Sequence, residues 1–522
     1  MDRLHPEFHV ESTPEKIALK FVPSGKSLTY RELNARSNQA AHLLRSLGLV
    51  RGDVIAILMH NLPEYFEIAW AADRAGLYYT GISTQLTSDE VAYIVADSGA
   101  KALFTCGALA PVAFGALEQC ENCLGYVVDR SIDRLHDYIA ERDTFPTSPI
   151  VDQSRGIPML YSSGTTGRPK GVKFPLPDLD LGGQDSLTEL LRSAFRMNDQ
   201  SIYLSPAPLY HSAPLRFSMT IHRLGGTTVV LEKFDPELAL QTIEAEGITA
   251  SQWVPTHFVR MLKMAPELRS RYDLSSHRFA IHAAAPCPIP VKQQMLDWWG
   301  PIIYEYYSGT EFNGMTLVSP DDWLSHPGTV GRAVFGTVHV TDEERAEDLP
   351  PRSEGLIYFE GGTKFVYHND PDKTAGSYNT YGWSTLGDVG WLDEDGYLYL
   401  TDRKSFMIIS GGVNIYPQEI EDAIIVHPRV ADAAVIGAPD EDLGERLVAV
   451  VQPLDWADAG PELAESIREQ LAKSLSRIKI PRQIDFMESL PRQPTGKLYK
   501  RLLRDQYWAA TKKEVAAAEQ ST

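Results

Sequence analysis

The most informative stretch of the chain is Tyr161-Ser-Ser-Gly-Thr-Thr-Gly-Arg-Pro-Lys-Gly-Val172, in which three glycines alternate with four hydroxyl side chains and two cations follow. This mixture suits a polyphosphate, because glycine lets the backbone approach an anion closely while hydroxyls and a lysine donate further hydrogen bonds. Pro169 stands five residues after Gly164, where the G-x-x-x-x-G-K-[ST] motif has its second glycine, so the stretch is not that motif. Apolar residues on both sides predict a loop between two short strands. A plain surface hairpin is the alternative interpretation.

Alternating strand and helix patterns surround this stretch up to about residue 310 and predict an α/β fold with a largely parallel sheet. Thr29 and Glu32 have the spacing of a capping box at the start of one of these helices. Residues 327–400 are rich in glycine and in strand patterns and predict a β-rich subdomain. The clearest expected elements are helices over 29–48 and 69–76 and strands over 53–59, 101–106, 355–359 and 396–400.

The pattern changes after Asp402, where a small α+β unit of a size able to fold alone is expected. The predicted organisation is therefore a large N-terminal domain over residues 1–402 and a small C-terminal domain over 403–522. Expected elements of the smaller domain are helices over 416–426 and 462–476 and strands over 430–436 and 446–452.

Length and composition favour an ordinary multidomain globular protein. The chain has 522 residues, more than one hydrophobic core usually holds, and is 43% hydrophobic and 23% charged. A net charge of −20 argues against nucleic acid or an anionic membrane as a partner, because both require a basic surface. An anionic ligand must therefore be held by local donors such as those of residues 161–172.

Targeting and redox signals are few. The first residues contain no apolar core of a signal peptide, and no apolar run approaches the roughly 18 residues of a membrane span. The four cysteines include one isolated C-x-x-C, Cys120 and Cys123, with no second pair to complete a zinc site. We expect free thiols and a cytoplasmic location.

Residues 161–172, with four later segments, resemble the adenylate-forming superfamily of acyl- and aryl-CoA ligases, firefly-type luciferases and peptide-synthetase adenylation domains. Matching segments run in the family's order from about Leu28 to Lys500. The resemblance implies a large N-terminal and a small mobile C-terminal domain, with ATP, Mg²⁺ and coenzyme A as ligands. In the first segment it implies that Thr165 also binds the metal and that ATP phosphates contact Ser162, Ser163, Gly164, Thr165, Thr166, Gly167 and Lys170.

Two further segments resemble the part of the family's site that binds the nucleoside and the metal. In Tyr307-Ser-Gly-Thr-Glu311 the resemblance implies that Tyr307 stacks on adenine, Thr310 contacts the α-phosphate and Glu311 binds Mg²⁺, for which a carboxylate is a suitable hard ligand. In Ser384-Thr-Leu-Gly-Asp388-Val-Gly-Trp391 it implies that Asp388 accepts both ribose hydroxyls. Without this context each segment reads as an ordinary turn.

The last two segments resemble the family's hinge and its C-terminal loop. Arg403 matches the arginine that contacts the nucleotide, and Lys497 matches the lysine that bridges the substrate carboxylate and the α-phosphate. The family usually has aspartate or lysine at the hinge, where this chain has Ser405 followed by Phe406. This departure leaves open how the domains switch. A solvated lysine is the plain alternative for Lys497.

The acid and the acceptor are indicated less directly. His211 stands where amino-acid-activating relatives have aspartate, and histidine there resembles acyl- and aryl-CoA ligases, although a core histidine is the alternative. The small residues up to Ala285 are expected to leave room for a nucleotide or acyl group. Gly411 and Gly412 resemble the CoA-ligase glycine motif that lines the pantetheine tunnel. Residues 175–198 are an acidic segment without an assignment.

The sequence therefore predicts an ATP-dependent carboxylic acid:CoA ligase that forms an acyl-adenylate and then an acyl-CoA thioester. The same adenylation with transfer to an amine or a carrier-protein thiol is the alternative within the enzymes. A catalytically silent nucleotide-binding homologue is the alternative outside them, although Glu311, Asp388, Arg403 and Lys497 are all present. The choice among fatty, steroid and aromatic acids and the oligomeric state, with a homodimer as one option, stay open.

Overall fold

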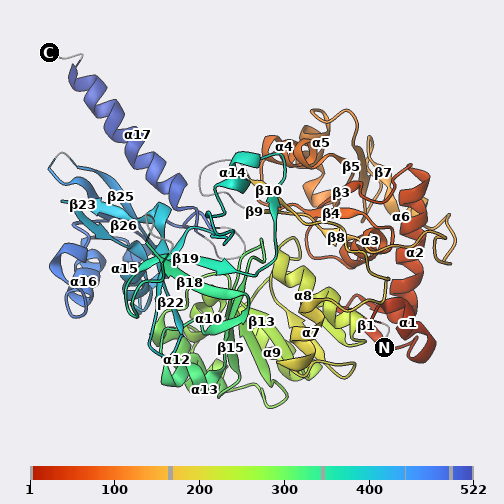
Figure 1. Ribbon diagram of the computed structural model, residues 1–522, viewed down its shortest axis with the longest axis horizontal. Coiled ribbons are helices and arrows are strands. Elements are labelled where there is room, and N and C mark those ends of the chain that lie inside the picture. The colour runs from red at the N-terminus through yellow and green to blue at the C-terminus, as the bar shows by residue number, and fades with distance from the viewer. Residues whose placement is uncertain (1–3, 163–168, 343–346, 441, 493–497, 520–522) are drawn as a thin grey trace. The chain divides into compact units, whose positions relative to one another are not determined.

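The computed structural model describes residues 4–162, 169–342, 347–440, 442–492 and 498–519. Contacts divide the chain into two compact units (Figure 1). The first contains residues 1–253, 266–281 and 364–376, and the second contains 254–265, 282–363 and 377–522. The predicted domain boundary near residue 402 lies inside the second unit and stays a prediction.

A parallel six-stranded sheet forms one part of the first unit. Its strand order is β7-β6-β5-β3-β4-β8, and every pair in it is parallel. This confirms the expected parallel α/β architecture. The strands are β3 (Val54–Leu58), β4 (Tyr78–Gly81), β5 (Ala100–Thr105), β6 (Leu124–Val127), β7 (His136–Asp137) and β8 (Ile157–Pro158).

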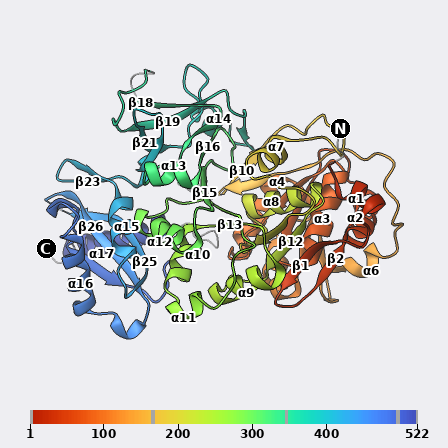
Figure 2. The same ribbon diagram turned by 90° about the horizontal axis from the view of Figure 1, so that it is seen from below.

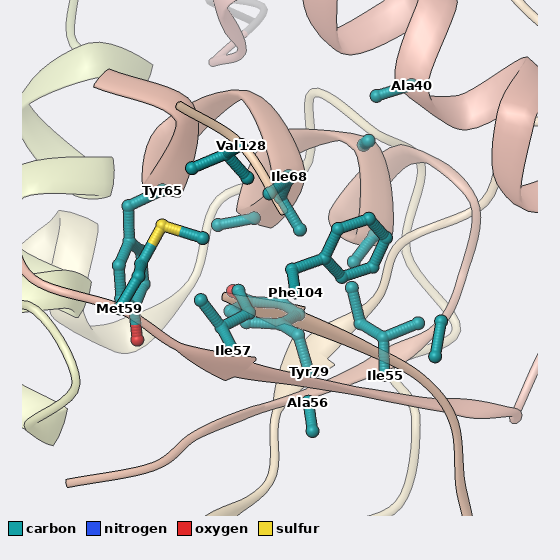
Figure 3. Packing of buried hydrophobic residues seen from close by; sticks show 14 of the residues in the cluster. Ala40, Ile55, Ala56, Ile57, Met59, Tyr65, Ile68, Tyr79, Phe104 and Val128 are labelled. Carbon is teal, nitrogen blue, oxygen red and sulfur yellow. The ribbon is translucent and has the colours of Figure 1, made fainter. Parts of the chain in front are cut away.

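Helices bury their apolar faces against this sheet. The predicted capping box is present: Thr29 accepts a hydrogen bond from the Glu32 N–H, and the Glu32 side chain accepts one from the Thr29 N–H. Figure 3 shows Ile57 and Ala56 on opposite sides of β3, as strand geometry requires, with Tyr65 and Ile68 of the neighbouring helix above. Helices α3 (Pro63–Arg74), α4 (Ser88–Ser98), α5 (Ala110–Leu117) and α6 (Tyr138–Arg142) contact strands of this sheet. Helix α2 (Tyr30–Ser46) packs on α3, and α1 (Pro6–Ser12) packs on α2.

A second group of strands in the first unit is also mainly parallel. Strands β1, β12, β11 and β13 pair in that order in parallel, and β2 adds an antiparallel edge to β1. The elements are β1 (Ile17–Val22), β2 (Ser27–Thr29), β11 (Ile202–Ser205), β12 (Thr227–Leu231), β13 (Ala250–Trp253), β14 (Phe279–His282), α8 (Ser212–Arg223), α9 (Pro236–Glu246) and α11 (Pro266–Arg269).

Three short antiparallel strands complete the first unit. Strand β10 (Lys170–Lys173) pairs with β9 (Leu160–Ser162) on one side and with β20 (Val366–Tyr367) on the other. The two short strands expected on either side of the glycine-rich loop are thus confirmed. Helix α14 (Pro371–Ala375) follows β20 in the chain and is labelled in Figures 1 and 2. The unassigned acidic segment contains α7 (Ser186–Ser193), whose N-cap Asp185 forms an ion pair with Arg155.

The second unit begins with an antiparallel ladder and a four-stranded sheet of order β18-β19-β21-β22, of which β18, β19 and β21 are labelled in Figure 2. The β-rich region is therefore confirmed. The elements are α10 (Pro255–Leu262), α12 (Ile289–Trp299), β15 (Ile303–Tyr307), β16 (Met315–Val318), α13 (Pro320–Ser325), β17 (Arg332–Phe335), β18 (Thr337–Thr341), β19 (Gly355–Glu360), β21 (Asp388–Leu392) and β22 (Leu398–Arg403).

The end of the second unit is a five-stranded sheet covered on both faces. Alternate residues of the long central strands enter two cores: Val435 packs with Ile420 and Ile467 from helices, whereas Ile436 packs with Leu503. The elements are β23 (Ile408–Ser410), β24 (Val413–Ile415), α15 (Pro417–Ile425), β25 (Val430–Asp440), β26 (Gly444–Pro453), α16 (Pro461–Leu471), β27 (Gln483–Phe486) and α17 (Lys500–Glu519).

A search of the described residues for a helix long and apolar enough to cross a membrane found none. All four cysteines are free thiols.

Candidate functional site

The hairpin of β9 and β10 holds both ends of the predicted phosphate loop. Ser162 and Lys170 are direct partners in this hairpin, so the chain leaves and returns at neighbouring points. Five of the predicted phosphate-binding residues lie outside the described part of the chain: Ser163, Gly164, Thr165, Thr166 and Gly167.

Acidic side chains contact both arms of this hairpin. Tyr161 donates a hydrogen bond to Asp97 Oδ2 at 2.6 Å, and Lys170 Nζ lies 3.0 Å from Asp370 Oδ2. Asn369 Nδ2, next to Asp370, donates to Asp97 Oδ1 at 3.2 Å. The predicted phosphate ligand Lys170 therefore has a carboxylate partner in this structure, and no local sequence pattern marks Asp97 or Asp370 as a partner of this hairpin.

His211 is held as a neutral imidazole at the start of α8. It is the N-cap residue of this helix, but its side chain makes no capping hydrogen bond. Its ring centroid lies 4.3 Å from that of Tyr210, and its Nε2 is buried without a hydrogen-bond partner among the described residues. Burial lowers the pKa of His211 to about 3. A neutral ring with an unsatisfied nitrogen can bind an uncharged or anionic group without adding a cation.

Three of the predicted nucleotide-binding residues meet at the ends of three strands in the second unit. Asp388 begins β21 and is paired in register with Arg403 at the end of β22, while Tyr307 ends β15. The Tyr307 hydroxyl donates to Asp388 Oδ2 at 2.7 Å, and Arg403 Nε donates to Oδ1 at 3.0 Å. We call Tyr307, Asp388 and Arg403 the nucleotide cluster.

The carboxylate of this cluster keeps hydrogen-bonding capacity. Asp388 is only 9% exposed, and an ionised carboxylate can accept about four hydrogen bonds. Among the described residues Tyr307 and Arg403 supply two hydrogen-bond donors to Asp388, which leaves acceptor positions for two hydroxyl groups. Burial, then the charge of Asp388, raise the pKa of Tyr307 well above its ordinary value, so this hydroxyl stays a donor. The Asp388 charge raises the pKa of Arg403.

The turn after Tyr307 brings the second and third sequence segments together. A Cβ added at Gly309 would collide with Leu386 Cδ1 and stand 2.8 Å from Glu311 Oε2, so a larger residue here would require both side chains to shift. Glu311 is buried and its charge contributes to the raised pKa of Arg403, whereas Thr310 is half-buried in the turn. No group of three or more histidine, cysteine, aspartate or glutamate side chains in the described ranges could hold a metal ion.

The remaining predicted residues are placed as follows. Gly411 and Gly412 form the two-residue turn between β23 and β24 and have φ angles of +57° and +79°, which favour glycine in such a turn. Ala285 is half-buried and follows Ala284, whose φ is +79°. Lys497 lies outside the described residues.

Comparisons with known proteins agree with this arrangement. The family described as "AMP-binding enzyme" matches residues 7–365, and "AMP-binding enzyme C-terminal domain" matches residues 419–497. The chain is 32% identical to the long-chain-fatty-acid–CoA ligase FadD13 of Mycobacterium tuberculosis, over 93% of this chain and 94% of that protein. It is 30% identical to the fatty acid–[acyl-carrier-protein] ligase ScoC of Streptomyces coeruleorubidus, over 99% of this chain and 100% of that protein.

Among solved structures, ATP-bound MatB from Rhodopseudomonas palustris is similar, with a TM-score of 0.80 at 28% identity over 97% of this chain and 99% of that one. Both family matches, the two curated relatives and this structure agree with the resemblance drawn from residues 161–172 and the later segments. The chain belongs to the AMP-binding enzyme family, and within it to the AMP-forming acyl-CoA synthetases.

Proposed function

We propose that the protein joins a carboxylic acid to coenzyme A in two half-reactions. The acid first attacks the α-phosphorus of ATP, which forms an acyl-adenylate and releases pyrophosphate. The thiolate of CoA then attacks the acyl carbon and displaces AMP. The observation that carries this proposal is the nucleotide cluster, because Asp388 offers two free acceptor positions beside an aromatic ring and a guanidinium.

Each residue has a role consistent with its surroundings. Asp388 accepts the two ribose hydroxyls, Tyr307 lies against adenine, and Arg403 adds positive charge near the phosphates. Glu311 and Thr165 are the proposed ligands of Mg²⁺, which would offset phosphate charge when bound. Lys497 stabilises the charge that develops during adenylation, and the hinge over 403–406 lets the C-terminal residues serve both half-reactions.

Fatty acids are the first substrates to test. FadD13 and ScoC are both named for fatty acids, and the buried, neutral His211 adds no cation. Transfer to a carrier-protein thiol, as the name of ScoC describes for that protein, is the second candidate for the acceptor.

The test is pyrophosphate release from ATP and Mg²⁺ with fatty, aryl and steroid acids, with and without CoA. Wild type is compared with Lys497→Ala and with Lys473→Ala, which removes an exposed lysine of the same region. We expect acid-dependent release that increases with CoA, collapses in Lys497→Ala and is unchanged in Lys473→Ala. Release that ignores CoA would favour an amine or a carrier protein as acceptor, and no release with any acid would refute the proposal.

A further inference from the structure

Asp402 is a buried carboxylate at the end of β22, directly before the proposed hinge. Its Oδ1 accepts a hydrogen bond from the Arg403 N–H at 2.6 Å, and its Oδ2 accepts one from the Gln418 N–H at 3.0 Å. Oδ2 also lies 4.0 Å from Lys500 Nζ. The carboxylate thus contacts two groups that follow the hinge in sequence.

The contact with Gln418 takes the place of a helix cap. The N-cap of α15, Tyr416, provides no side-chain hydrogen bond, and Pro417 has no N–H, so Gln418 carries the first N–H of the helix that needs a partner. An acidic side chain at a helix N-terminus is favourable because it satisfies such a donor and complements the helix dipole. Here the acid comes from sixteen residues upstream rather than from the helix itself.

Lys500, the first residue of α17, places a positive charge beside the Asp402 carboxylate. Its Nζ lies 2.9 Å from Glu421 Oε2 and 5.0 Å from the ring centroid of Phe406. Lys500, Glu421 and Asp402 are 7%, 8% and 9% exposed. Because these charges are largely removed from water, their interactions are screened less than those of surface pairs. Phe406, which follows the unusual hinge residue Ser405, gives the ammonium a cation–π contact.

We propose that Asp402 is a positioning residue that fastens α15 and the start of α17 to the strand before the hinge, and that releases them when the enzyme changes between its half-reactions. The inference rests on the proposed function, which requires rotation about residues 403–406. The contacts of Asp402 with Gln418 and Lys500 join residues on opposite sides of that segment, so rotation breaks them. The pair between Glu421 and Lys500 lies entirely after the segment and persists.

The test measures the two half-reactions separately. Adenylation is followed by acid-dependent exchange of pyrophosphate into ATP without CoA, and thioester formation by CoA-dependent AMP release from a preformed acyl-adenylate. Each rate scales with the population of its competent arrangement. In Asp402→Ala we expect the ratio of the two rates to change about fivefold, which is the effect of losing one capping hydrogen bond. The half-reaction that needs the released arrangement becomes faster relative to the one that needs the fastened arrangement. Asp402→Asn keeps an acceptor for Gln418 and should give a smaller change in the same direction.

The control is Ser319→Ala, which removes the N-cap oxygen of α13 that accepts a hydrogen bond from the Asp322 N–H and lies outside the hinge. It should leave the ratio at its wild-type value. Equal losses in both half-reactions of Asp402→Ala, or an unchanged ratio, would overturn the inference while the proposed function stands. If Asp402→Ala does not fold, the near-isosteric Asn variant is judged by the same ratio. A wild type inactive in both assays would refute the proposed function and this inference with it.

Discussion

Replacement of Ala284 by glycine is expected to stabilise the protein. The φ angle of Ala284 is +79°, a region that costs a residue with a Cβ about 1–2 kcal/mol relative to glycine. Ala284 is exposed, so its methyl group contributes little packing. Glycine has more freedom in the unfolded chain, which opposes the gain by about 0.5–1 kcal/mol. The net expected increase in the free energy of unfolding is about 0.5–1 kcal/mol.

Urea unfolding followed by tryptophan fluorescence measures this change as a shift of the midpoint to higher urea. The neighbouring Ala283→Gly is the matched control, because Ala283 is only 7% exposed and is not among the residues with positive φ. That variant should shift the midpoint to lower urea, since it loses both a buried methyl group and backbone restriction. A lower midpoint in Ala284→Gly would show that strain at this position has been misjudged.

Three further predictions concern the nucleotide cluster, pH and a buried ion pair. Tyr307→Phe removes a hydrogen bond to a charged acceptor, worth about 1.5–3 kcal/mol, and should raise the KM for ATP while the KM for CoA stays unchanged. Lys292→Met should lower the free energy of unfolding by about 3–5 kcal/mol, because it leaves Glu305 buried without the ammonium that lies 2.5 Å from its Oε2. The double variant Lys292→Met/Glu305→Gln should regain part of the lost stability, because it also removes the buried carboxylate charge. The unfolding midpoint should fall as pH drops below about 6.5, because the unfolded state then binds protons that the folded state excludes. The responsible histidines have a folded pKa of about 3: His211, His222, His257 and His277.

The controls for these predictions separate each cause. An equal rise of both KM values in Tyr307→Phe would indicate general distortion rather than loss of a nucleotide contact. If the double variant is no more stable than Lys292→Met, the isolated carboxylate is not the source of the loss. His222→Gln should flatten the pH dependence, by about 2 kcal/mol at pH 5. An equally steep dependence in this variant would contradict the assignment to His222.

Local signals in the sequence predicted local structure well. The capping box of Thr29 and Glu32 and the strand pair around residues 161–172 depend on neighbouring residues, and both are present. The helix expected to reach residue 476 ends at Leu471, since the serines that follow compete for backbone hydrogen bonds. Periodicity identifies an element more reliably than its last residue.

Long-range contacts could not be predicted in the same way. Nothing near Lys170 indicates that Asp370 is its partner, and nothing near Gln418 indicates that Asp402 caps its helix. The sequence predicts the nucleotide cluster only through the resemblance of three separate segments to one family. In the structure, the register of β21 and β22 places Asp388 opposite Arg403, and a hydrogen bond joins Tyr307 to Asp388. The roles of Thr310, Glu311 and Lys497 stay predictions.

The interleaving of the two units also has a consequence for biosynthesis. Strand β20 and α14 belong to the first unit, yet the ribosome makes them after strands β15 to β19 of the second unit. Until residue 370 emerges, β10 has an open edge and Lys170 has no Asp370 beside it. Unpaired strand edges invite wrong partners during folding. A nascent chain stopped before residue 364 should therefore depend on chaperones, and neither unit can be expressed as a single uninterrupted fragment.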